Sequence, residues 1–252
     1  MKSLMHWLVL LAASVLALQM FFVLRIAVMI VLDPQSSAFQ RSEAWRLQHE
    51  KGRLPWRQQW VSYEKISHQL KQAVIASEDD SFINHDGVDW EALEKAWQKN
   101  ARAEVQIAKA QPGKKAGAVS ASGTPRLRQA KVVGGSTITQ QLAKNLFLSG
   151  ERTLLRKGQE LVLTLMLETL LSKQRILEIY LNSVEWGEGV FGAEAAAQHY
   201  FRKPASRLNA YEAARLAVML PRPKYFEKVP DSGYLAERAG VIVSRMGGAE
   251  VP

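Results

Sequence analysis

The chain has 252 residues, 47% of them hydrophobic and 23% charged, which suffices for one sizeable folded core but not for two catalytic domains of ordinary size. It has no cysteine, and this excludes disulfide scaffolds, thiolate zinc sites and cysteine nucleophiles. A formal net charge of +9 predicts attraction to a polyanion, which could be nucleic acid, anionic lipid or a phosphorylated substrate.

The N-terminus is almost continuously apolar from Trp7 to Leu32, and the first charge after Trp7 is Arg25. This length predicts a transmembrane anchor over residues 1–32. A cleavable signal peptide is the alternative, because Val15-Leu16-Ala17 resembles a cleavage site, but the apolar run continues well beyond it. Basic residues flank both ends in nearly equal numbers, so charge alone does not fix the orientation.

The rest of the chain is expected to be mainly α-helical. Residues 33–60 are polar and indicate a linker or a loosely packed start of the domain. Ile66, Leu70 and Val74 recur at helical spacing and predict a helix that ends between residues 77 and 80. Residues 99–131 carry a net charge of +7 and are expected to form a mobile basic loop. Helical patterning continues to residue 220 without a convincing strand, and residues 231–252 are expected to be a C-terminal tail.

The first group of chemically interesting residues spans 78–87. Glu78 follows Val74 by one helical turn, so it should lean toward the buried face, where partial desolvation would raise its pKa and suit it to proton transfer. The simpler alternative is a solvated acidic helix end. His85 has no second metal ligand at a helical spacing and is expected to hydrogen-bond locally.

A second group follows two glycines at 134 and 135. Thr137 and Gln140 have the spacing of a helix-capping box, and the free N–H groups of such a helix start can bind an anion. An ordinary capped helix explains these two residues equally well. The additional Ser136 and Gln141 favour a ligand site.

A third group comprises Arg152, Arg156 and Glu160, which would share one helical face, with Lys157 beside them. A surface ion pair between Arg156 and Glu160 is the common use of this spacing. The next segment, residues 161–171, is too short to span a bilayer and is expected to be a buried central helix or one that dips into lipid. Together these features suggest a cleft wall.

Four motifs, in this order, resemble the peptidoglycan glycosyltransferases of glycosyltransferase family 51. They are Glu78-Asp79-x-x-Phe82-x-x-His85-x-Gly87, Gly135-Ser136-Thr137-Ile138-Thr139-Gln140-Gln141, Arg156-Lys157-x-x-Glu160 and Ile176-Leu177-Glu178-x-Tyr180-Leu181-Asn182. The resemblance covers about residues 60–230 and places the glycosyltransferase domain at 61–230. A Lys-Thr-Gly element is absent, so no transpeptidase activity is expected. The basic stretch before Gly134 is longer than the family pattern leads one to expect.

The resemblance implies a lysozyme-like fold behind a single-pass anchor, with the catalytic domain in the periplasm on the bacterial inner membrane. The implied substrate is lipid II, a disaccharide-pentapeptide on undecaprenyl pyrophosphate, which would be polymerised with inversion into β-1,4-linked glycan strands. Other cell-wall synthesis and division proteins are possible partners; nucleic acid is not an expected partner. No organic cofactor is implied.

The resemblance also implies roles for individual residues. Glu78 would be the catalytic base, and Glu160 would orient the cations or hold a divalent metal such as Mg²⁺ or Mn²⁺. The candidates for diphosphate binding are Lys144, Arg152, Arg156 and Lys157, and those for the sugar and phosphate subsites are Ser136, Thr137, Gln140 and Gln141.

Two other classes remain open at this stage. A lysozyme-like or lytic peptidoglycan-cleaving enzyme would share the fold, although it would have less use for four cations. A membrane-anchored nucleic-acid-binding protein would explain the charge but not Glu78.

Overall fold

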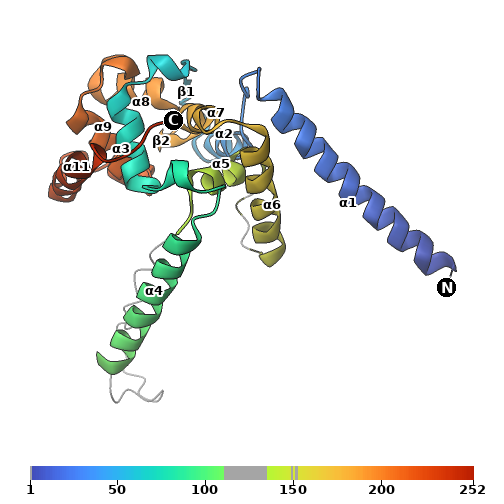
Figure 1. Cartoon of the computed structure of the whole chain (residues 1–252). Helices are drawn as coiled ribbons and strands as arrows, with labels where there is room; N and C mark the ends of the chain where they lie inside the picture. The colour runs from blue at the N-terminus through green and yellow to red at the C-terminus, as the bar shows by residue number, and fades with distance from the viewer. Residues whose placement is uncertain (1, 111–134, 149, 151–152) are drawn as a thin grey trace, which may run out of the picture. The chain divides into compact units, whose positions relative to one another are not determined.

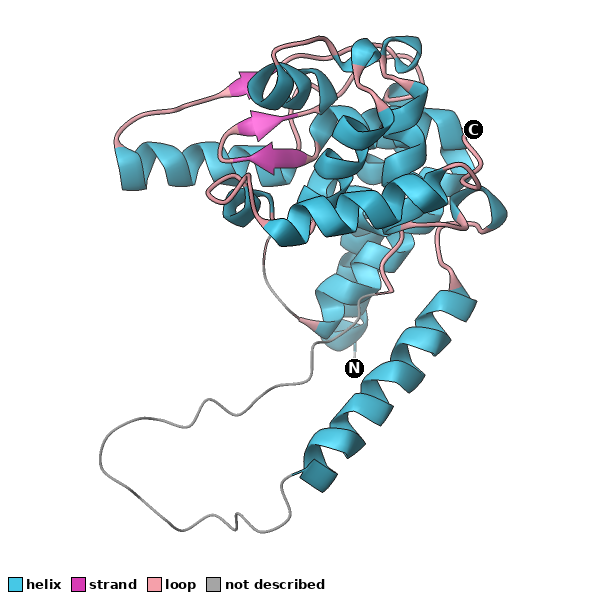
Figure 2. Cartoon of the chain, turned by 90° about the vertical axis from the view of Figure 1, so that its left-hand side faces the viewer, coloured by secondary structure: helices cyan, strands magenta, loops and turns pink. Residues whose placement is uncertain are grey.

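The computed structural model describes residues 2–110, 135–148, 150 and 153–252, and this part of the chain is mainly α-helical, as predicted (Figures 1 and 2). The elements are α1 (Lys2–Val28), α2 (Ala38–Lys51), β1 (Arg57–Gln58), η1 (Tyr63–Lys65), α3 (His68–Glu78), η2 (Phe82–Asn84), α4 (Trp90–Ala110), α5 (Ile138–Phe147), α6 (Leu154–Leu170), α7 (Lys173–Ser183), β2 (Glu185–Gly187), β3 (Val190–Phe191), α8 (Ala193–Phe201), η3 (Ala205–Arg207), α9 (Ala210–Met219), α10 (Pro223–Phe226) and α11 (Gly233–Met246). Residues 89–136 form a compact unit separate from the rest.

Helix α1 confirms the apolar N-terminal element. From Ser3 to Val28 it is long and apolar enough to cross a membrane. Most of its side chains are exposed, but Ile26 and the following Met29 are buried at its C-terminal end. There Arg175 Nε donates a hydrogen bond to the Met29 carbonyl at 2.8 Å. The chain just after α1 is therefore held against the start of α7.

The core is built around α3, α9 and α11, which pack against one another (Figure 1). The predicted helix end is confirmed, because α3 ends at Glu78. The expectation of a C-terminal tail is wrong: α11 buries Leu235, Ala239, Ile242 and Met246. These apolar residues recur at spacings of three and four, which makes a helix with one buried face.

A small sheet has the strand order β1-β3-β2, with β1 and β3 parallel and β2 and β3 antiparallel (Figure 2). The sequence predicted no strand in this part of the chain, and this expectation is therefore wrong. Strands of two or three residues are too short to show an alternating pattern. The turn between β2 and β3 needs Gly189, which has a φ of +74° and lies directly against the Pro55 carbonyl, where a Cβ would overlap the backbone.

Residues 33–60 are not only a linker, since they contain α2 and β1. Helix α2 begins with a capping box between Ser37 and Gln40, and it buries Leu47 completely. Its polar side also packs, because Glu43 accepts a hydrogen bond from Lys224 Nζ at 2.5 Å. Of the two expectations for residues 33–60, the start of the domain therefore fits better than a linker, and paired charges explain how a polar segment can pack.

The unit 89–136 contains α4, which continues to Ala110. The predicted basic loop, residues 99–131, therefore begins too early: residues 99–110 are helical. Between positions 90 and 110 the chain consists largely of strong helix formers and has no glycine or proline, which favours a helix whatever its charge. The remainder of the predicted loop, residues 111–131, lies outside the described residues.

Candidate active site

Glu78 lies at the C-terminal end of α3, where its carboxylate is half-buried. Gln141 Nε2, on α5, donates a hydrogen bond to Glu78 Oε2 at 3.0 Å. Burial raises the pKa of Glu78, the Gln141 hydrogen bond and the charge of Lys144 lower it, and the charge of Asp79 raises it further. The net shift is upward, which is what a carboxylate used as a proton acceptor requires.

Asp79 fixes the segment that follows Glu78. Its Oδ2 accepts a hydrogen bond from the Ile138 backbone N–H at 2.9 Å, and its Oδ1 lies 2.8 Å from His85 Nε2. His85 Nδ1 accepts from the Gly87 N–H at 3.1 Å, so Nε2 carries the proton that is shared with Asp79. The predicted local hydrogen bonding of His85 is confirmed. Asp79 thus docks the loop after α3 onto the first residue of α5.

The start of α5 is a capping box, as the spacing of Thr137 and Gln140 predicted. Thr137 Oγ1 accepts from the Gln140 N–H at 3.1 Å, and Gln140 Oε1 accepts from the Thr137 N–H at 3.2 Å. Thr137 Oγ1 also donates to the Gly87 carbonyl at 2.6 Å. The Gly87 carbonyl therefore takes the proton of the Thr137 hydroxyl, and the hydroxyl oxygen caps the start of α5. Substrate binding by Thr137 and Gln140 remains a prediction, and so does binding by Ser136, an exposed residue of the unit 89–136.

Helix α6 brings cations together around Glu160, a carboxylate only 4% exposed. Arg156 Nη1 lies 3.0 Å and Lys157 Nζ 2.5 Å from its two oxygens. The Nε of Arg156 is buried and has no hydrogen-bond partner within the described chain. The proposed face of the third motif thus exists for Arg156 and Glu160, whereas Arg152 lies outside the described residues.

Lys144 lies within electrostatic reach of Glu78 and of the charged side chains on α6. Burial is the largest influence on its pKa and lowers it; Glu160 raises the pKa, Arg156 and Lys157 lower it, and Glu78 raises it. The net shift of the Lys144 pKa is downward. Its ammonium, on α5, therefore lies near the charges of both Glu78 and the α6 cluster.

Helix α6 has two apolar sides. Leu163 and Leu167 are fully buried, as a central helix requires. Leu154 and Leu155 are 93% and 86% exposed, and Leu165 is exposed as well. Within residues 161–171, Leu161, Val162 and Leu165 are exposed, so the helix is not buried all round. That this side dips into lipid remains a prediction.

The described residues do not form a divalent-metal site around Glu160. No group of three His, Asp or Glu side chains converges anywhere in the described part of the chain. Glu160 is a single carboxylate with both oxygens paired to cations. In this arrangement Glu160 orients the two cations. Binding of a divalent ion by Glu160 together with a substrate diphosphate remains a prediction.

Tyr180 belongs to the fourth sequence motif, but its position in that motif predicts no role for it. Its side chain is fully buried on α7, and its hydroxyl donates to Gln141 Oε1 at 3.0 Å. Thr139, Glu168 and Lys173 form another hydrogen-bonded group for which the sequence predicted no role. Thr139 Oγ1 donates to Glu168 Oε1 at 2.5 Å, and Lys173 Nζ donates to the same oxygen at 2.9 Å. Only the spatial position of these residues reveals their contacts.

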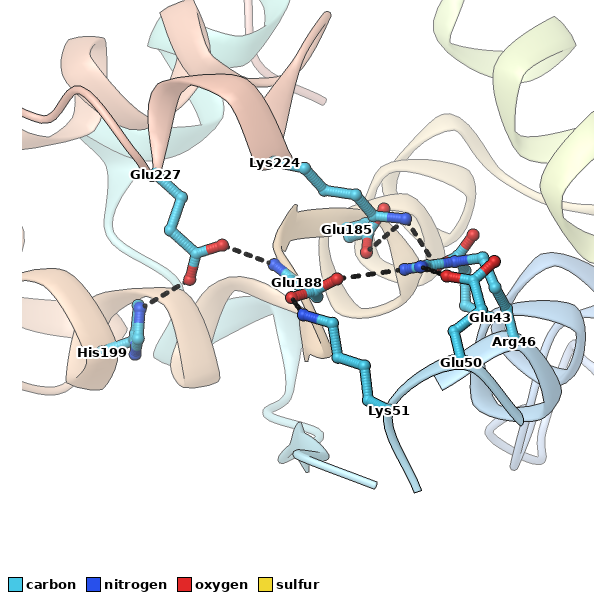
Figure 3. A network of polar contacts seen from close by, with 9 residues as sticks. All are labelled: Glu43, Arg46, Glu50, Lys51, Glu185, Glu188, His199, Lys224 and Glu227. Carbon is cyan, nitrogen blue, oxygen red and sulfur yellow. Dashed lines mark hydrogen bonds and ion pairs between the residues drawn. The ribbon is translucent and has the colours of Figure 1, made fainter. Parts of the chain in front are cut away.

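A second cluster of titratable groups was also missed, and it is built from other elements (Figure 3). Lys224 lies 3.4 Å from Glu185 on β2 and also pairs with Glu43 on α2. Glu188 pairs with Lys51 and Arg46, and its backbone N–H donates to Glu227 at 2.8 Å. These interactions join α2 to the hairpin of β2 and β3 and to α10.

Comparison with known proteins identifies the family. The family model "Transglycosylase" matches residues 48–110 and 111–247. The chain belongs to the transglycosylase family.

Similar proteins carry the same assignment. The biosynthetic peptidoglycan transglycosylase of Burkholderia thailandensis is 55% identical over 241 residues, covering 96% of this chain and 84% of the relative. The protein of the same name from Paraburkholderia phytofirmans is 50% identical over 251 residues, covering 98% of this chain and 94% of the relative. The predicted family, the lysozyme-like α-helical fold and the glycosyltransferase class are thereby confirmed. The match extends beyond the predicted 61–230 at both ends: it begins at residue 48, near the end of α2, and runs to residue 247, which includes α11.

Proposed function

We propose that this transglycosylase polymerises lipid II into β-1,4-linked glycan strands and releases undecaprenyl pyrophosphate. The observation that carries the proposal is the half-buried Glu78 carboxylate, which is hydrogen-bonded by Gln141 and lies within electrostatic reach of Lys144. The relatives named biosynthetic peptidoglycan transglycosylases support the choice of substrate.

Glu78 supplies the base that the reaction needs. The acceptor 4-hydroxyl gives its proton to Glu78 while its oxygen bonds to the anomeric carbon of the donor, and the bond from that carbon to the diphosphate oxygen breaks. Attack from the face opposite the leaving group inverts the α-linked donor to a β-linkage. A strong acid is unnecessary, because pyrophosphate already leaves readily.

The departing diphosphate needs cations rather than an acid. Lys144, Arg156 and Lys157 supply three positive charges, and Glu160 orients the last two. The Nε of Arg156, which has no hydrogen-bond partner among the described residues, leaves one buried donor for a phosphate oxygen. We assign the diphosphate to this group together with Arg152, and we assign the sugar subsites to Ser136, Thr137, Gln140 and Gln141.

The exposed apolar surfaces suit a lipid-linked substrate. Helix α1 is long enough to anchor the chain, and Leu154 and Leu155 at the start of α6 are almost fully exposed. We propose that α1 crosses the bacterial inner membrane and that the catalytic domain faces the periplasm, where it meets lipid II and the growing strand. Other cell-wall synthesis and division proteins remain possible partners.

Incubation of the purified full-length chain with labelled lipid II tests the proposal. We expect long glycan products that lysozyme digests. Shortening of preformed peptidoglycan without growth would instead identify a lytic enzyme, and an unchanged lipid II substrate would refute the proposal.

Glu78→Gln tests the role of the base. The substitution keeps the size and hydrogen-bonding capacity of the side chain but removes the proton acceptor, so polymerisation should fall at least about a hundredfold while lipid II binding survives. Asp80→Asn, which neutralises an exposed neighbouring carboxylate, is the matched control and should retain most activity. Near-wild-type polymerisation by Glu78→Gln would exclude Glu78 as the base.

A further inference from the structure

Three buried or half-buried side chains from three helices form a chain of hydrogen bonds that ends at the catalytic carboxylate. The Tyr180 hydroxyl, on α7, donates to Gln141 Oε1 at 3.0 Å. Gln141 Nε2, on α5, donates to Glu78 Oε2, at the end of α3, also at 3.0 Å. The phenol has no other hydrogen-bond partner among the described residues. Tyr180 does not reach the carboxylate directly and acts on it only through Gln141.

The amide of Gln141 has a donor end and an acceptor end, so its orientation decides whether it stabilises or repels an ionised Glu78. In the observed orientation its N–H faces the carboxylate. If the amide flipped, its oxygen would face the carboxylate oxygen, and the buried phenol proton would lose its acceptor. Both changes are unfavourable. The hydroxyl proton of Tyr180 therefore selects the orientation of the amide that supports the ionised base.

The surroundings of Tyr180 keep it a permanent donor. Burial raises its pKa well above the ordinary value, and the nearby charges of Glu78 and Asp79 raise it further. The charged and titratable groups that act on Glu78 are Asp79 beside it, Lys144 from α5 and Tyr180 from α7. Of these, only Tyr180 is bonded to the amide that contacts Glu78.

We propose that Tyr180 is a positioning residue, which orients the Gln141 amide so that it holds the Glu78 carboxylate ready to accept the proton of the acceptor hydroxyl. The inference rests on the proposed function of Glu78 as the base. It assigns the tyrosine of the fourth motif a task in the reaction besides its place in the core.

Tyr180→Phe removes only the hydroxyl and tests this role. The Gln141 amide is then free to rotate, its hydrogen bond to Glu78 weakens, and the ionised carboxylate loses stabilisation. The acid limb of the pH–rate profile should move to higher pH by about half a unit to one unit, and turnover below neutral pH should fall several-fold. In a Gln141→Leu background, the same substitution should have no further effect on the acid limb, because the connection is already broken.

Tyr200→Phe is the matched control. It removes the hydroxyl of a second tyrosine, which is partly buried and donates to the Trp186 carbonyl at 2.8 Å. If the role of Tyr180 were purely structural, Tyr180→Phe would lower the thermal midpoint and total activity of the protein as Tyr200→Phe does, and the acid limb would not move. An unchanged acid limb in Tyr180→Phe, or an equal movement in Tyr200→Phe, would overturn the inference.

A measurement that does not depend on turnover separates this inference from the proposed function. The side-chain carboxyl of Glu78 can be followed by ¹³C NMR in labelled full-length protein in detergent micelles, with the signal identified by its loss in Glu78→Gln. Tyr180→Phe should raise the titration midpoint of this carboxyl, and an unchanged midpoint would refute the connection. If the wild type fails to polymerise lipid II but Tyr180→Phe still raises the titration midpoint of Glu78, the proposed function fails and the connection from Tyr180 through Gln141 to Glu78 stands.

Discussion

Glu185 offers a quantitative test of the electrostatics of this fold. The side chain lies on β2 and is 5% exposed. The pKa of Glu185 is raised from 4.5 to about 7: burial is the main cause, Lys224 partly offsets it, and the charge of Glu43 adds to it. Glu185 Oε1 lies 3.4 Å from Lys224 Nζ, an ion pair too long to count as a hydrogen bond, and accepts no hydrogen bond in the described chain. We predict that Glu185→Gln stabilises the protein at alkaline pH.

The magnitude follows from linkage between protonation and folding. A carboxyl whose pKa is 4.5 in the unfolded chain and about 7 in the folded chain changes the free energy of unfolding by up to about 3 kcal/mol. Because the folded pKa is the higher one, this contribution is complete below pH 4.5 and is lost as the pH rises through about 7. The amide introduced by Glu185→Gln cannot ionise, so at pH 8 the variant should be more stable than the wild type by about 1 to 3 kcal/mol. Lys224 keeps a partner, because Glu43 remains 2.5 Å away.

The assay is urea unfolding of the full-length protein in detergent micelles between pH 5 and pH 8, followed by circular dichroism. The wild type should lose stability across this range, and Glu185→Gln should show a flatter profile. Glu188→Gln is the control, because hydrogen bonding to Lys51 and Arg46 holds the pKa of Glu188 below its ordinary value. Removal of the Glu188 carboxylate by Glu188→Gln should lower the free energy of unfolding throughout this pH range. Equal slopes for the wild type and Glu185→Gln would refute the reasoning.

Two further predictions concern the site. Lys144→Ala and Arg152→Ala should each reduce polymerisation at least about tenfold, because each removes a charge that we assign to the diphosphate. Lys144→Ala should cost little thermal stability, since the Lys144 side chain is exposed to solvent and an exposed charge contributes little to folding. Removal of Lys144 should also raise the pKa of Glu78. Arg207→Ala, at an exposed position on η3, is the control. If Lys144→Ala or Arg152→Ala lost melting temperature and activity in equal measure, a substrate role would be contradicted. Gly87→Ala should destabilise the protein by about 2 to 4 kcal/mol in the same unfolding assay, because Gly87 has a φ of +86° and an added Cβ would lie 2.6 Å from Thr164 Cγ2. Gly158→Ala, where the added Cβ meets nothing within 4 Å on α6, should be neutral or stabilising; equal stability of the two variants would refute the argument.

Local patterns in the sequence determined several elements of this protein. The apolar run of α1, the end of α3 at Glu78 and the capping box of Thr137 and Gln140 each depend on residues within one or two helical turns. Hydrophobic spacing and turn chemistry act over that same range, so they can be read without the fold. The four ordered motifs added the family, because chance does not produce all of them together.

Other elements escaped because their polar sequences conceal how they pack. Helix α2 is polar on average, yet it buries Leu47 and pairs Glu43 with a lysine 181 positions away. The strands of the small sheet have too few residues to show a period of two. Such elements become ordered through the residues they pack against in the fold, and the composition of a segment does not show which residues those are.

Only the tertiary structure decided how the site is held together. Tyr180 and Gln141 are 39 positions apart, and Gln141 and Glu78 are 63 apart, yet each pair is joined by a hydrogen bond of 3.0 Å. The raised pKa of Glu185 is likewise invisible in the sequence, because an ordinary glutamate becomes unusual only where β2 is buried. The sequence therefore determined which residues could do the chemistry. The packing of α3, α5 and α7 decided which of them meet, since hydrogen bonds and desolvation act only over a few ångströms between groups that the fold brings together.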